Sequence, residues 1–302
     1  MDGLYIILTG ALVAISCGLL GCFLILRKMA MIGDAISHAV LPGIVIAYFI
    51  AGDRDTIPML IGAGLLGIIA TFLIEYFHQK GRLQTDASIG VTFTWLFALG
   101  VILVSAFAGQ VDIDQECVLY GEIGLIELDV LIFGDGAMMI PRVFLIMIFI
   151  TILVLAFIIV GYRGLYLTTF DPVYAATIGV STALWHYMLM GFVSLTTVAS
   201  FEAVGAILVV AMIVVPPATA YLLTEKLLPM LLLSTVFGVL TAIGGYYLAV
   251  WIDGSIAGAM ATVAGILFGI VYGYQRVKKI KDSKVDMTLL EQQEIPHTRS
   301  AT

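Results

Sequence analysis

Long apolar stretches separated by short polar interruptions run along almost the whole chain. An α-helix needs about 20 predominantly apolar residues to cross a bilayer. The stretches occupy residues 4–26, 29–51, 57–77, 87–108, 143–160, 175–195, 203–215, 230–250 and 257–274. This pattern predicts an all-α fold, a polytopic membrane helix bundle of about nine transmembrane helices.

The composition agrees with a membrane protein that has no separate soluble domain. Hydrophobic residues make up 61% of the 302 positions and charged residues only 12%. A soluble domain carries about 25% charged residues. Near its C-terminus the chain becomes basic and then polar. We therefore expect a transmembrane domain at residues 1–283 and a polar, disordered cytoplasmic tail at residues 284–302.

The distribution of basic residues predicts the orientation of the bundle. Lysine and arginine gather in the loops that face the cytoplasm. Nine spans with the N-terminus outside place five basic groups inside: Arg27–Lys28, Lys80–Arg82, Arg163, Lys226 and the C-terminal tail. The longest interruption, residues 110–141, is acidic and has no lysine or arginine, so it is expected outside. If this loop re-enters the membrane, the number of spans becomes eight or ten.

One short stretch, MIGDAISHAVLPG at residues 31–43, combines ionisable residues with an apolar setting. Asp34 and His38 are four apart, which places both side chains on one face of a helix. A carboxylate and an imidazole together suit divalent manganese, iron or zinc. On a continuous helix His38 lies about 15 Å above Lys28, near the bilayer midplane. Pro42–Gly43 predicts a kink directly above the pair.

The pair also has other interpretations. Asp34 and His38 could hydrogen-bond each other as a structural pair, or relay protons in a stand-alone transporter driven by an ion gradient. The second alternative predicts internal inverted repeats, which are not visible in the chain. A membrane-embedded metalloprotease would need an HExxH motif, which the sequence lacks. His186 is expected to hydrogen-bond within the bundle.

Glu202 is a further candidate for contact with a cation. It opens an apolar stretch, and a carboxylate at that position is costly unless it is used. It could line an outer gate, or it could be a solvated residue of an outside turn at residues 196–202.

Two long strings carry a family resemblance: LRKMAMIGDAISHAVLPG, ending at Gly43, and SFEAVGAILVVAMIVVPPATAYLLT at residues 200–224. With them the chain resembles the permease subunits of bacterial ABC importers for manganese, zinc and iron, the ABC-3 type. Within that family it is most similar to the manganese permeases of Gram-positive bacteria. The resemblance implies a translocation subunit rather than an enzyme, in the bacterial cell membrane. It implies manganese first, and zinc or iron next, as a transported substrate passing Asp34 and His38, with no permanently bound cofactor.

The resemblance also implies partners. ATP would be hydrolysed by separate ATPase subunits on the cytoplasmic face, since the chain has no GxxxxGK[ST] motif. A metal-binding lipoprotein would dock outside, and a second permease, identical or paralogous, would complete the pathway; no nucleic-acid partner is implied. The residues after the proline pair would form a short helix at the inner surface that couples to the ATPase: Pro217, Ala218, Thr219, Ala220, Tyr221, Leu222, Leu223, Thr224, Glu225 and Lys226.

Overall fold

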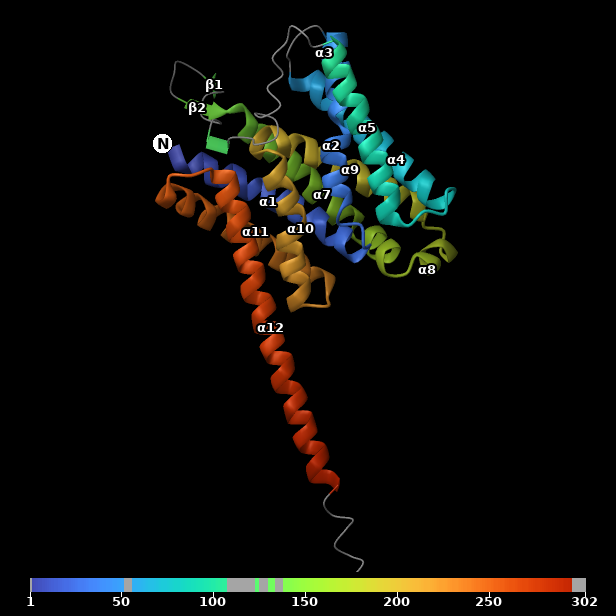
Figure 1. Ribbon diagram of the computed structural model, residues 1–302, viewed down its shortest axis with the longest axis vertical. Helices are drawn as coiled ribbons and strands as arrows, with labels where there is room; N and C mark the ends of the chain where they lie inside the picture. The colour runs from blue at the N-terminus through green and yellow to red at the C-terminus, as the bar shows by residue number, and fades with distance from the viewer. Residues whose placement is uncertain (1, 52–55, 108–122, 125–129, 134–137, 295–302) are drawn as a thin grey trace, which may run out of the picture.

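The computed structural model describes residues 2–51, 56–107, 123–124, 130–133 and 138–294. Almost all of them are helical (Figure 1). In chain order the elements are α1 (Asp2–Leu26), α2 (Ile32–Ala39), α3 (Leu41–Ala51), α4 (Thr56–Gln79), α5 (Thr85–Phe107), β1 (Val130–Phe133), β2 (Met138–Pro141), α7 (Arg142–Phe170), α8 (Pro172–Thr177), α9 (Thr182–Val204), α10 (Ala206–Leu223), α11 (Leu227–Ile252) and α12 (Ile256–Glu294).

The predicted fold class is confirmed. Within the described ranges, 9 helical segments are long and apolar enough to cross a membrane. The exposed apolar faces of these helices are unfavourable in water, so the bundle requires a bilayer around it. The strands β1 and β2 add an antiparallel hairpin in which Val130 pairs with Pro141 and Phe133 with Met138. The hairpin belongs to the acidic interruption, most of which lies outside the described residues.

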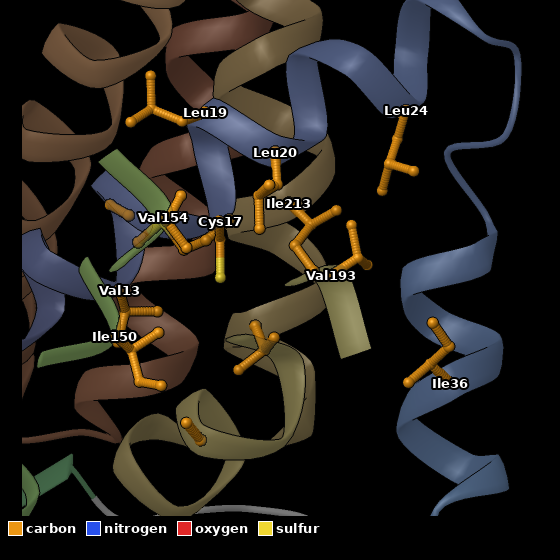
Figure 2. Close-up of a cluster of buried hydrophobic side chains, with 14 of the residues drawn as sticks. Val13, Cys17, Leu19, Leu20, Leu24, Ile36, Ile150, Val154, Val193 and Ile213 are labelled. Carbon is orange, nitrogen blue, oxygen red and sulfur yellow. The ribbon is translucent and has the colours of Figure 1, made fainter. Parts of the chain in front are cut away.

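Helix α1 is the centre of the larger part of the bundle. It packs against α7, α9, α10 and α11, and 78% of its apolar window is buried, the largest share of any described span. Figure 2 shows Val13, Cys17 and Leu20 of α1 beside Val154 of α7 and Ile213 of α10. Through this core α1 packs against α9, one of the helices that carry ionisable side chains.

A second group of helices, α2 to α5, packs alongside this core (Figure 1). Helix α3 lies against α4 and α5, and α2 lies against α5, α9 and α4. The α3–α4 contact is built on Gly43 and Gly62, because a Cβ on either residue would come within 2.5 Å of the other's carbonyl oxygen. Two helices can approach this closely only where side chains are absent.

Helix α12 extends far beyond the rest of the bundle (Figure 1). Its backbone stays helical to Glu294, so residues 284–294 are helical where the sequence predicted a disordered tail. Residues 276–294 contain no glycine or proline and are rich in lysine, glutamate, glutamine and leucine, which favour a helix. Pro296 follows two residues after Glu294. The tail residues 295–302 lie outside the described part of the chain.

Candidate metal site in the membrane

The Asp34–His38 pair lies on α2, a helix of only 8 residues that is interrupted at both ends. On one side Lys28 adopts a left-handed backbone with φ of 60°, which turns the chain after α1. On the other side the helix breaks at Val40, and α3 begins at Leu41. Pro42 has no N–H to donate to the carbonyl of His38, four residues earlier, so the helix is weakened there. The helix is therefore interrupted where the sequence predicted a kink, and the interruption falls two residues before Pro42.

The two side chains face the same way, as their spacing predicted. Asp34 Oδ1 and His38 Nε2 are 3.7 Å apart, and the side chains are 40% and 31% exposed. Apart from Ser37, the rest of α2 is buried against the bundle through Ile32, Gly33, Ala35, Ile36 and Ala39. The carboxylate and the imidazole therefore lie on the one open face of this helix. Asp34 is also in the first turn, where the helix dipole favours a negative charge.

Aromatic side chains of α5 hold the imidazole in place. The His38 ring lies 5.7 Å from the ring of Phe93 and 5.7 Å from the ring of Phe97, measured between centroids. These rings restrict the orientation of the imidazole and leave its Nε2 directed towards Asp34. Within the described residues, no group of three or more histidine, cysteine, aspartate or glutamate side chains is arranged to hold a metal ion. One chain therefore offers two ligands at this face.

Glu202 has a different place in the fold from the one predicted. Residues 196–202 were expected to form an outside turn, but α9 continues through them to Val204. The stretch has no glycine or proline to end a helix, and its hydroxyl residues Thr196, Thr197 and Ser200 are buried inside the bundle. The turn falls at Gly205, whose φ of 77° strongly favours glycine. The side chain of Glu202 lies outside the described structure, so its role at a gate stays a prediction.

The segment expected to couple to an ATPase does not form a separate helix. Helix α10 runs through Pro216 and Pro217 without a break and ends at Leu223. Pro217, Thr219 and Ala220 are buried in the bundle, whereas Tyr221 is exposed. A short turn at residues 224–226 then leads into α11. The proline pair is tolerated because α1 packs directly over it: a Cβ on Gly21 would lie 2.0 Å from the Ile213 carbonyl oxygen, which Pro217 cannot bond.

A short exposed helix does exist, but at a different point in the chain. Helix α8 connects the long helices α7 and α9, and most of its residues are exposed, including Val173 and Tyr174. Asp171 caps it by accepting a hydrogen bond from the Tyr174 N–H at 2.9 Å, and Pro172 occupies its first turn. The Asp171–Pro172 pair is a sequence signal for a helix start, and it lies outside the apolar stretches that predict the membrane spans.

Arg27 ties the turn before α2 to the helix that leads into α8. Its Nε donates to the Thr169 hydroxyl at 3.1 Å and its Nη2 to the Thr168 hydroxyl at 3.0 Å. Burial lowers the pKa of Arg27 to about 10, which leaves the guanidinium charged at neutral pH. We call the end of the bundle that carries Arg27 and α8 the α8 end. This contact joins the turn before α2 to the last turn of α7, which directly precedes α8.

A polytopic helix bundle with a carboxylate and an imidazole on an apolar helical segment is typical of membrane transport proteins. Comparison with known families makes the assignment specific. The model of the ABC 3 transport family matches residues 4–274. The chain belongs to the ABC 3 transport family.

Relatives with assigned roles resemble the chain over nearly its whole length. The manganese transport system membrane protein MntD of Bacillus subtilis is 48% identical over 89% of this chain and 90% of its own. The zinc transport system membrane protein TroD of Treponema pallidum is 43% identical over 88% of this chain and 72% of its own. Among solved structures, PsaBC from Streptococcus pneumoniae in complex with Fab matches with a TM-score of 0.74 and 32% identity, covering 91% of this chain and 94% of that one.

These comparisons confirm the family resemblance drawn from the two sequence strings. They also confirm a multi-pass protein of the bacterial cell membrane that acts as a translocation component and not as an enzyme. The chain is a permease subunit of an ABC transport system.

Proposed function

We propose that the chain is the membrane subunit of an ATP-driven importer of divalent transition metals, with manganese as the first substrate and zinc or iron next. The observation that carries the proposal is the Asp34–His38 pair, 3.7 Å apart on the open face of α2. Relatives that share 48% and 43% of their residues with this chain belong to manganese and zinc transport systems. Carboxylate and imidazole ligands suit all three metals, so the order rests on these relatives.

The partial exposure of the pair supports a pathway shared between two permeases. One chain supplies one carboxylate and one imidazole at this face, whereas a second copy or a paralogue would double the set. Four ligands are enough to replace much of the hydration of a divalent ion. Such a site should bind weakly, because conduction requires release as well as binding. The metal is a substrate of this site and is not a resident cofactor.

The ATPase subunits would dock at the α8 end of the bundle, which we take as cytoplasmic. Arg27 and Lys28 lie at this end, where Arg27 contacts Thr168 and Thr169 of α7, in keeping with the positive-inside rule. The exposed helix α8 replaces residues 217–226 as the main proposed contact, and the turn at residues 224–226 is a second one. The metal-binding lipoprotein would dock at the opposite end, where the N-terminus and the β1–β2 hairpin lie together (Figure 1).

Transport in proteoliposomes tests the proposed function. The complex of permease, ATPase and binding protein should accumulate Mn²⁺ when ATP is supplied to the ATPase, and an ATPase variant that cannot hydrolyse ATP should abolish accumulation. Uptake that follows an imposed proton gradient, with the permease alone in the membrane, would instead support the stand-alone transporter. The first result supports an ATP-driven importer, and the second supports a transporter driven by an ion gradient.

The role of α8 is tested separately by co-purification with the ATPase. Val173→Asp places a charge on a residue that is 75% exposed on α8 and should reduce recovery of the ATPase at least fivefold. Trp251→Ser is the matched control, because Trp251 is 82% exposed but lies at the end of α11, away from the α8 end. Equal recovery of the ATPase with both variants would place the docking surface elsewhere.

A further inference from the structure

A second carboxylate–imidazole pair joins two helices near the α8 end of the bundle. Glu75 belongs to α4 and His186 to α9, far apart in the sequence. Glu75 Oε2 and His186 Nε2 are 3.4 Å apart, and the two side chains are 22% and 18% exposed. The pair is therefore more enclosed than Asp34 and His38, whose side chains are 40% and 31% exposed.

The position of this pair relative to α2 follows from one close contact between helices. Gly67 of α4 meets both Ser194 of α9 and Ile36 of α2: a Cβ on Gly67 would lie 1.8 Å from Ser194 Oγ and 3.4 Å from Ile36 Cγ2. Ile36 is midway between Asp34 and His38. Glu75 and His186 each lie eight residues from this contact, which corresponds to about 12 Å along both helices towards the α8 end.

The donor atoms are spaced as a metal ion would require. Zinc–nitrogen and zinc–oxygen bonds are about 2.0–2.2 Å long, so two ligands of one ion are separated by about 3.0 Å at a right angle and about 3.4 Å at the tetrahedral angle. The Glu75–His186 separation of 3.4 Å falls at that value. Ionisable side chains at such positions in membrane helices are costly and commonly mark a substrate pathway.

We propose that Glu75 and His186 form a second, transient metal contact through which the ion leaves the Asp34–His38 pair towards the cytoplasm. The inference rests on the proposed function and adds a second metal contact to the pathway. Both pairs offer one carboxylate and one imidazole, so the ion meets the same ligand chemistry at each contact. Helix α2 packs against both α4 and α9, so the two carboxylate–imidazole pairs lie on adjoining helices.

The charge of Arg27 suits a site of release. Arg27 lies at the same end of the bundle as the Glu75–His186 pair, and its position is fixed by the hydroxyls of Thr168 and Thr169. A guanidinium near the site repels a bound cation and shortens its stay. Because Arg27 is attached to the helix that leads into α8, movement of α8 on the ATPase would shift this charge relative to the pair.

The rival explanation is that Glu75 and His186 only tie α4 to α9. The double variant Glu75→Gln/His186→Gln separates the two explanations, because two amides can still hydrogen-bond across the helices but are poor ligands for a divalent ion. In the complete complex, this variant should lower ATP-driven Mn²⁺ uptake at least tenfold at unchanged abundance. His78→Gln is the matched control: His78 is an exposed histidine on the last turn of α4 and should transport as the wild type does. Uptake at the wild-type rate in the double variant would overturn the proposal.

Metal selectivity gives a readout that a structural tie would not change. Glu75→Cys replaces a hard oxygen ligand with a soft thiolate, which favours zinc over manganese. At a pathway contact, the ratio of Zn²⁺ to Mn²⁺ transported should rise at least fivefold, whereas an unchanged ratio would contradict a metal contact. If the wild-type complex itself transported no metal, the proposed function would fail and this inference with it. Failure confined to the Glu75 and His186 variants would leave the proposed function standing.

Discussion

The contact between Gly43 and Gly62 predicts a large difference between two chemically identical substitutions on α4. A Cβ added to Gly62 would lie 2.5 Å from the carbonyl oxygen of Gly43 and 2.6 Å from Cβ of Ala47. A Cβ added to Gly64, two residues further along the same helix, would meet nothing within 4 Å. Gly62→Ala therefore forces α3 away from α4, whereas Gly64→Ala does not.

The size of the effect follows from the overlap. Non-bonded heavy atoms are most stable about 3.5 Å or more apart, so the helices must separate by about 1 Å to admit the new methyl group. The atoms that must move are a backbone carbonyl and a Cβ, which have no rotamer of their own. Overpacking of this kind costs about 1–3 kcal/mol. Replacement of glycine by alanine within a helix contributes up to about 1 kcal/mol of stabilisation, equally in both variants.

Reversible unfolding in mixed micelles, followed by circular dichroism, measures the difference. Gly64→Ala should be as stable as the wild type or up to about 1 kcal/mol more stable, and Gly62→Ala should be about 1–3 kcal/mol less stable than Gly64→Ala. Comparing the two variants cancels their shared gain in helix propensity. Equal free energies of unfolding would refute the close α3–α4 contact and the packing that supports α2.

Three further substitutions have defined outcomes. Gly205→Ala, at a backbone φ of 77° between α9 and α10, should lower the free energy of unfolding by about 1–3 kcal/mol in the same assay. Arg27→Lys keeps the charge but cannot reproduce both hydroxyl contacts, so it should destabilise by about 1–2 kcal/mol and lower metal uptake per ATP hydrolysed. Asp171→Ala removes the cap of α8 and costs about 1 kcal/mol locally; it should weaken ATPase recovery while the unfolding of the bundle hardly changes.

The apolar pattern predicted most of the fold because membrane helices must satisfy their backbone internally and are long. The shared face of Asp34 and His38 could also be predicted, since it depends only on helical spacing. The break at Val40 was foreseen from Pro42 because a missing N–H acts locally. These features depend on residues that are close in sequence.

Features that depend on packing between distant segments were not predictable in the same way. The polar stretch before Val204 was expected to be a turn, but neighbouring helices bury its hydroxyl groups. The proline pair at residues 216–217 was expected to end a helix, but α10 continues under the cover of α1. The pairing of Glu75 with His186 joins two helices whose contact no local pattern encodes.

Metal uptake by cells that express the complete complex tests the central claim most directly. Asp34→Asn and His38→Gln should each reduce accumulation of one metal among manganese, zinc and iron to background, at unchanged membrane abundance and ATPase assembly. Asp86→Asn and His78→Gln change exposed residues at the loop between α4 and α5 and should transport as the wild type does. Mass spectrometry of the cells identifies the metal. Uptake that persists in both Asp34→Asn and His38→Gln would show that the pair is structural and that the metal takes another path.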